Sequence, residues 1–229
     1  MPRIAKTSAE ELLGPLNDVE RKYAPTVLYV AGRTEVIFEG PRVAVVGSRK
    51  ATDRGRESAA RLADELVRQN VTIVSGLARG IDTVAQQTAV DAGGRTIAVL
   101  GTPLDVCTPK QNAPLQQRIM QEHLAVSQFD AGRPVQRRNF PMRNRTMALI
   151  CHASIIVEAG NGSGTLSQGW EALRLGRPLF IMEHVASCTA LSWPAKMLGY
   201  GARLLGSDVD EVLDLLPDPS RSLSLDYAF

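Results

Sequence analysis

Cysteine is scarce in this sequence of 229 residues: Cys107, Cys151 and Cys188 lie far apart, their number is odd, and they form no CxxC pair. A disulfide framework and a cysteine-based metal site are therefore not expected. Long hydrophobic runs are also missing, because the longest apolar stretch, residues 148–157, is too short to span a membrane. The first residues contain no apolar core of a signal peptide. These absences predict a cytoplasmic protein with no membrane partner.

The usual catalytic motifs are absent as well. The sequence has no GxxxxGK[ST], its first glycine turn is not GxGxxG, and GxSxG is missing. His123, His152 and His184 stand alone, without an HxxxH or HExxH pair. A P-loop nucleotide hydrolase, an NAD enzyme, a serine hydrolase and a zinc peptidase all lack support. We therefore expect no cofactor, no metal and no catalytic residue.

The composition is that of a globular protein, with 44% hydrophobic and 22% charged residues and a net charge of +2. The length suits one large domain and an appendage. The division we expect is a short N-terminal appendage at residues 1–40, a main domain at 41–216 and a flexible tail at 217–229.

Within the main domain, short apolar runs alternate with segments of helical spacing. Continuous apolar runs are typical of strands in a parallel sheet that is covered on both faces. Such alternation, with right-handed crossovers, gives an α/β doubly wound, Rossmann-like fold whose sheet is mostly parallel. The expected strands are 43–46, 71–74, 95–100, 124–127, 154–157, 178–182 and 202–205. The expected helices are 56–68, 82–92, 111–122, 145–151, 163–175, 190–198 and 208–215. For the appendage we expect a helix at 8–13 and strands at 26–30 and 35–38.

Four of the expected strands end in a turn that contains glycine. In open α/β sheets ligands bind at this edge, where the following helices present unpaired N–H groups that attract phosphate. Hydroxyl groups and one arginine in these turns would add donors. The alternative is architectural, since any such turn favours glycine for its dihedral angles. The turns contain Gly47, Ser48 and Arg49; Gly76 and Gly80; Gly101; and Ser163, Gly164 and Thr165.

A basic segment lies between Asp130 and Glu158, where no acidic residue occurs. We expect it to form an anion-binding loop. The alternative is that its arginines pair with carboxylates elsewhere in the fold or coat the surface. Phe140 lies within this segment and is either a base-stacking residue or an anchor to the core. The arginines are Arg133, Arg137, Arg138, Arg143 and Arg145.

An ordered set of motifs, from about Val27 to Leu205, resembles the DprA/Smf family of bacterial DNA-processing proteins. The resemblance implies an extended Rossmann fold that binds single-stranded DNA, loads a RecA-type recombinase during natural transformation and forms a homodimer. It also implies a DNA pocket lined by Arg49, Arg138, Arg143 and Arg145, with Phe140 nearby. The motifs are GSR at 47–49, SGLARGID at 75–82, TIAVLG at 96–101, LD at 104–105, FPMRNR at 140–145, and EA at 158–159 with SGTL at 163–166.

The sequence departs from the family pattern at Gln86, Thr108 and Gln128, where histidine, tyrosine and glutamate are usual. The glycine turn at 162–165 also resembles that of the LOG-type phosphoribohydrolases, which cleave nucleoside monophosphates. Those enzymes need a glutamate where this chain has Gln168, and an amide cannot accept a proton as a carboxylate does.

Our leading hypothesis from the sequence is a non-enzymatic protein that binds single-stranded DNA. The alternatives are a nucleotide-binding protein and a LOG-like hydrolase, for which Glu158 and Glu171 would be the carboxylates in range. The predicted DNA- or phosphate-binding residues are Gly47, Ser48, Arg49, Gly76, Gly80, Gly101, Arg138, Phe140, Arg143, Asn144, Arg145, Ser163, Gly164 and Thr165.

Overall fold

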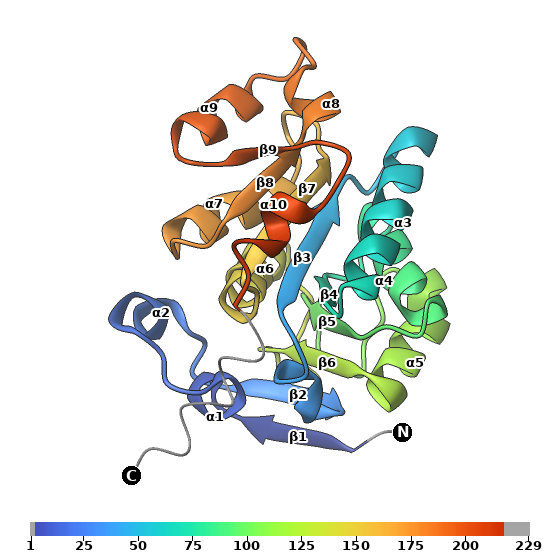
Figure 1. Cartoon of the computed structure of the whole chain (residues 1–229). Coiled ribbons are helices and arrows are strands. Elements are labelled where there is room, and N and C mark those ends of the chain that lie inside the picture. Colours follow the sequence, from blue (N-terminus) through green and yellow to red (C-terminus); the bar gives the residue numbers. More distant parts are fainter. Residues whose placement is uncertain (1–2, 218–229) are drawn as a thin grey trace.

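A computed structural model describes residues 3–217 and shows a nine-stranded sheet with helices on both faces (Figure 1). The strand order is β1-β2-β6-β5-β4-β3-β7-β8-β9. From β6 to β9 the neighbouring strands are parallel, while β1 and β2 are antiparallel to their neighbours. The strands are β1 (Ile4–Thr7), β2 (Leu28–Gly32), β3 (Arg42–Gly47), β4 (Thr72–Ser75), β5 (Thr96–Leu100), β6 (Leu124–Ser127), β7 (Ala153–Glu158), β8 (Leu179–Met182) and β9 (Arg203–Leu205).

The helices cover both faces of the sheet because the central strands are apolar on both sides. Along β3, Val43 and Val45 pack with α3, α4 and α10, whereas Ala44 and Val46 pack with α6 and α9. This alternation buries all four side chains and confirms the predicted doubly wound fold. The helices are α1 (Ala9–Leu13), α2 (Asp18–Tyr23), α3 (Asp53–Arg68), α4 (Ile81–Asp91), α5 (Ala113–Glu122), α6 (Asn139–Ile150), α7 (Thr165–Arg174), α8 (Glu183–Ala186), α9 (Trp193–Gly199) and α10 (Asp210–Leu213), with 3-10 turns η1 (Thr34–Ile37) and η2 (Lys110–Asn112).

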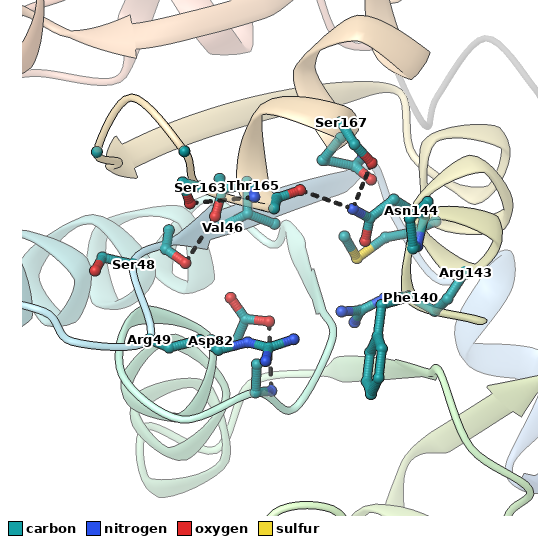
Figure 2. A pocket seen from close by; sticks show the side chains of 18 of the residues that line it. Val46, Ser48, Arg49, Asp82, Phe140, Arg143, Asn144, Ser163, Thr165 and Ser167 are labelled. Carbon is teal, nitrogen blue, oxygen red and sulfur yellow. Dashed lines mark hydrogen bonds between the residues drawn. The ribbon is translucent and has the colours of Figure 1, made fainter. Parts of the chain in front are cut away.

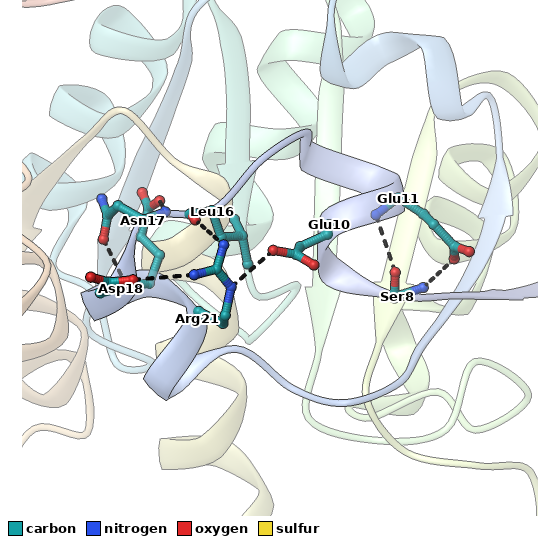
Figure 3. Close-up of polar contacts among 8 residues, drawn as sticks. Ser8, Glu10, Glu11, Leu16, Asn17, Asp18 and Arg21 are labelled. Atoms are coloured by element: carbon teal, nitrogen blue, oxygen red, sulfur yellow. Dashed lines mark hydrogen bonds and ion pairs between the residues drawn. The ribbon is translucent and has the colours of Figure 1, made fainter.

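The two short N-terminal helices are fixed at their starts by reciprocal capping. Ser8 caps α1 and exchanges hydrogen bonds with Glu11, which lies three residues later in the sequence. Asn17 caps α2 in the same way with Glu20. Arg21 then links the two helices through Glu10, as Figure 3 shows. These contacts shape the segment that leads into β2, which joins the main sheet beside β6.

Most predicted elements are confirmed within a few residues, but three differ. The run at 35–38 is the 3-10 turn η1 and not a strand, because its backbone bonds locally, with the Phe38 N–H donating to the Glu35 carbonyl over 2.8 Å. Helix α6 begins six residues earlier than expected, at Asn139. The helix expected at 190–198 begins at Trp193, and β1, α2 and α8 were not predicted. The division at residue 40 stays a prediction, and residues 218–229 of the expected tail lie outside the described residues.

His152 holds the start of β7 to the start of β3. The backbone N–H of Arg42 donates to His152 Nδ1 over 3.0 Å, and the backbone N–H of His152 donates to the Arg42 carbonyl over 2.8 Å. Burial, with the positive charges of Arg42 and Arg177, lowers the pKa of His152 to about 3. The folded protein therefore keeps this imidazole neutral.

This low pKa predicts acid sensitivity. In the unfolded chain a histidine binds a proton below about pH 6.5, so the unfolded state takes up the extra proton as the pH falls from 6.5 toward 3. The free energy of unfolding contributed by His152 should therefore fall by about 2 kcal/mol between pH 7 and pH 5. Urea unfolding of the wild type and of His152→Asn at both pH values measures it. The destabilisation caused by the substitution should be smaller at pH 5 than at pH 7. Equal destabilisation at both pH values would contradict the low pKa of His152 in the folded protein.

Candidate nucleic-acid interface

A cavity of about 560 Å³ opens at the carboxyl edge of the sheet, between the ends of β3 and β7 and the start of α6 (Figure 2). The turn after β3 forms one wall, and the glycine-rich turn after β7 forms another. Ligands of parallel α/β sheets bind at this edge, so the cavity lies where the sequence predicted a site. Its lining includes Gly47, Ser48, Arg49, Lys50, Asp82, Phe140, Arg143, Asn144, Ser163, Gly164, Thr165, Ser167 and Gln168.

Two exposed cations stand at the wall formed by the β3 turn. The guanidinium of Arg49 lies 5.1 Å from the centre of the Phe140 ring, a cation–π arrangement that holds it toward the cavity. Lys50 follows directly, and its backbone N–H donates to Ser48 Oγ over 3.1 Å. Neither side chain forms an ion pair with any carboxylate of residues 3–217. Both charges are therefore available to an anion.

Arg143 is in a different environment, because it is buried in the floor of the cavity and only 5% exposed. Its Nη1 donates to the carbonyl of Val99 over 2.9 Å. Burial lowers the pKa of Arg143, and the negative charge of Asp82 opposes that shift. Burial likewise raises the pKa of Asp82, which accepts from the backbone N–H of Gly76 over 3.2 Å. Arg143 thus ties α6 to the ends of β4 and β5.

Two of the predicted glycines are explained by this chain's own side chains. A Cβ at Gly76 would lie 1.2 Å from Arg143 Nη1, and a Cβ at Gly101 would lie 2.7 Å from the Phe140 ring. Neither glycine lines the cavity. At these two turns glycine makes room for side chains of α6, a reason that differs both from ligand approach and from the dihedral-angle alternative. Around Gly164, by contrast, no atom approaches within 4 Å of an added Cβ, so that turn is open.

The polar groups of the glycine-rich turn already hold the cavity wall together. Thr165 Oγ1 donates to the Gly47 carbonyl over 2.8 Å, so this hydroxyl hydrogen joins the turns after β3 and β7. Asn144 Nδ2 donates to the Gly164 carbonyl and to Ser167 Oγ. Ser163 Oγ accepts from the backbone N–H of Thr165. The wall is therefore preorganised before any ligand arrives.

The structure brings together nine of the fourteen predicted residues at this cavity and leaves five outside it. Arg138 is exposed just before α6. Arg145 points to the N-terminal helices, where it pairs with Glu171 and lies 5.4 Å from the Tyr23 ring. The other three are Gly76, Gly80 and Gly101.

Comparison with known proteins decides the family. The sequence matches the family model of DNA recombination-mediator protein A over residues 12–217. The chain belongs to this family. The predicted DprA/Smf membership is confirmed.

Among curated relatives, this member of the family is 42% identical over 157 residues to DNA processing protein DprA of Streptococcus pneumoniae, covering 69% of the chain and 55% of the relative. It is 34% identical to Protein Smf of Escherichia coli, covering 84% and 51%. The chain spans about half the length of these relatives.

Solved structures of family members agree with the fold. The DprA structure from Streptococcus pneumoniae matches with a TM-score of 0.80 and 33% identity, covering 94% of this chain and 75% of that one. A DNA processing protein A from Helicobacter pylori, described for its single-stranded DNA binding mode, matches with a TM-score of 0.76 and 25% identity, covering 97% and 98%. A molybdenum cofactor binding protein from Rippkaea orientalis, at 18% identity over 80% of this chain and 97% of that one with a TM-score of 0.55, shares the fold alone.

In this family member the carboxylates considered for hydrolysis are occupied. Glu158 accepts hydrogen bonds from the backbone N–H and the hydroxyl of Thr52. Glu171 pairs with Arg145 and Arg174 and does not line the cavity. Gln168 does line it, with its Nε2 donating to Ser154 Oγ. Within residues 3–217 no cluster of metal-ligating side chains occurs, and no helix is long and apolar enough to cross a membrane.

Several lining residues were missed by sequence reasoning. Lys50 directly follows the recognised Gly47-Ser48-Arg49 turn, and its charge was a readable signal. Ser167 lies on the first turn of α7, and a helical projection from Thr165 would have placed it on the cavity wall. Asp82, in the first turn of α4, also lines the cavity and was not among the predicted site residues.

Proposed function

We propose that this protein binds single-stranded DNA at the cavity and acts there without catalysis, in DNA processing or recombination. The observation that carries the proposal is a pair of exposed cations, Arg49 and Lys50, which form no ion pair among residues 3–217 and line a cavity of about 560 Å³ in a member of this family. The relative from Helicobacter pylori, whose described property is single-stranded DNA binding, matches over nearly the whole chain and supports it.

The chemistry of the cavity suits a flexible polyanion. Guanidinium and ammonium groups bind phosphate oxygens through charge-assisted hydrogen bonds, and each bound phosphate releases counterions. The Phe140 ring borders the same space, where an aromatic surface favours an unpaired base over a stacked duplex. Phosphate contacts carry no sequence information, so we expect little dependence on base order.

The hydrolase alternative has less support from the geometry. Asp82 is the carboxylate among the lining residues, and it is buried. Its Oδ2 accepts from the backbone N–H groups of Gly76 and Ala78, so this carboxylate is engaged in holding the turn after β4. We propose a binding role on this ground.

The partners we propose rest on the family alone. A protein that holds single strands for recombination would deliver them to a RecA-type recombinase, and a homodimer would hold one strand at two cavities. We propose that the dimer binds the strand and delivers it to the recombinase in the cytoplasm. Co-sedimentation with the recombinase on single-stranded DNA and light scattering test these two proposals.

The direct test compares ligands by fluorescence anisotropy at two salt concentrations. We expect binding to a thymidine twenty-mer, weaker binding to the matching duplex, and little binding to thymidine monophosphate. On single strands the logarithm of affinity should fall with the logarithm of salt with a slope of about −0.7 for each phosphate contacted.

Two outcomes would count against the proposal. If the affinity for the twenty-mer does not change with salt, the bound strand makes no phosphate contacts of the proposed kind. Release of free base from a nucleoside monophosphate, with no affinity for the oligonucleotide, would favour the hydrolase.

A further inference from the structure

A second cavity, of about 370 Å³, adjoins the first on the side of α3 and α4. The two cavities share Arg49 and Lys50, which stand between them. Its other polar lining residues are Arg56, Arg79, Thr83 and Gln111, and no described residue that lines it carries a carboxylate. Four positive side chains thus face a space that sequence reasoning did not single out.

A close contact between two turns places Arg79 beside the shared cations. The backbone N–H of Ile81 donates to the Ser48 carbonyl over 3.2 Å, which joins the turn after β4 to the turn after β3. Gly80 has a φ of +88°, and a Cβ there would lie 2.2 Å from the same carbonyl oxygen. Only glycine allows this approach, so the backbone itself brings Arg79 to Arg49.

The turn that carries Arg79 is held in an unfavourable conformation by buried hydrogen bonds. Leu77 has a φ of +52°, which non-glycine residues rarely adopt. Its N–H donates to Gln86 Oε1 over 3.1 Å, and its carbonyl accepts from Asn112 Nδ2 over 2.8 Å. The N–H groups of the two residues that flank Leu77, Gly76 and Ala78, both donate to Asp82 Oδ2. Backbone strain that is held this firmly is typical of functional sites.

The charges of the second cavity are largely unneutralised. Arg79 is exposed and forms no ion pair within the described part of the chain. Arg56 is paired with Asp53 over 2.5 Å and also donates to the Ala51 carbonyl. Arg79, together with Arg49 and Lys50, therefore supplies the free positive charge. Such a cluster on a rigid turn raises the local concentration of anions.

We propose that the second cavity is a further phosphate subsite, and that one nucleic-acid strand runs from the first cavity past Arg49 and Lys50 to Arg79. The inference rests on the proposed function, because it assigns a path to the same ligand. Arg79 lines the second cavity and not the first, so we expect a nucleotide confined to the first cavity to leave it uncontacted and a longer strand to place its next phosphates there. The subsite therefore contributes affinity only to longer strands.

The experiment titrates wild type, Arg79→Ala and Arg61→Ala with a thymidine twenty-mer, and with a thymidine trinucleotide by competition. Arg61 is an exposed arginine of α3 that lines neither cavity and serves as the matched control. For Arg79→Ala we expect about fivefold weaker binding of the twenty-mer, a salt slope flatter by about 0.7, and unchanged binding of the trinucleotide. Arg61→Ala should match the wild type on both ligands, and unchanged melting temperatures would show that both variants are folded.

Each other outcome is decisive. If wild type binds neither ligand, the proposed function fails. If wild type binds both and Arg79→Ala changes neither, or weakens both equally, the separate subsite is wrong while the proposed function stands.

Discussion

Gly76→Ala should lower the free energy of unfolding by about 3–5 kcal/mol, the range of a severe core defect. The added Cβ would overlap Arg143 Nη1, at 1.2 Å. The guanidinium must move, but it is buried, and moving it leaves the Val99 carbonyl without its donor. It also separates the buried charges of Arg143 and Asp82. For a protein of ordinary stability this is a large part of the total.

A double-mutant cycle identifies the cause. Arg143→Ala alone is destabilising, because it leaves Asp82 without its positive neighbour and opens a gap beneath the cavity. In the Arg143→Ala background, however, Gly76→Ala meets no guanidinium, so its cost should fall to about 1 kcal/mol or less. Urea unfolding of the four proteins measures this coupling.

Gly199→Ala provides the matched control, since no atom lies within 4 Å of a Cβ at that position at the end of α9. It should change stability by no more than about 0.5 kcal/mol. If Gly76→Ala behaves like this control, Arg143 does not lie over Gly76, and the described floor of the cavity is incorrect.

The sheet was predictable because its strands are continuous apolar runs. β3 and β7 are buried on both faces, so their sequences contain few polar residues and end abruptly at Gly47 and Glu158. The rule that parallel strands end at one edge then placed Arg49 and Thr165 near each other without coordinates. Both line the cavity.

The basic segment was harder to interpret, because composition does not distinguish a loop from a helix start. Proline and asparagine around Phe140 favoured a loop, yet Pro141 lies in the first turn of α6, where a backbone N–H has no partner in the helix and proline is tolerated. With the helix begun at Asn139, the side chains of Arg143 and Arg145 point in different directions. One is buried under the cavity and the other contacts Tyr23.

The role of each strand-end glycine also could not be predicted from the sequence. A glycine that lets a ligand approach and a glycine that makes room for a side chain of the same protein have the same local pattern. The occupants of the space at Gly76 and Gly101 come from α6, more than thirty residues later. The role of Gln86, which stands where the family pattern has histidine, also depends on partners that the sequence does not reveal. Its Oε1 accepts from the Leu77 N–H, and its Nε2 donates to Thr96 Oγ1 and to the Ile97 carbonyl.

Arg49 is the residue through which the whole proposal can be tested, because it stands between both cavities and over the Phe140 ring. Its removal takes away a guanidinium that forms paired hydrogen bonds with phosphate and stacks on an aromatic surface. Arg49→Ala should weaken binding of the thymidine twenty-mer about tenfold, which is about 1.4 kcal/mol. Its effect should exceed that of Arg79→Ala.

The decisive measurement is the affinity of Arg49→Ala for the thymidine twenty-mer across a series of salt concentrations, beside wild type and Arg61→Ala. The proposal predicts a tenfold loss at low salt, a slope flatter by about 0.7, and convergence with wild type as salt rises, since the lost contact is electrostatic. Equal affinity and equal slope for Arg49→Ala and wild type would show that the strand binds elsewhere on the protein.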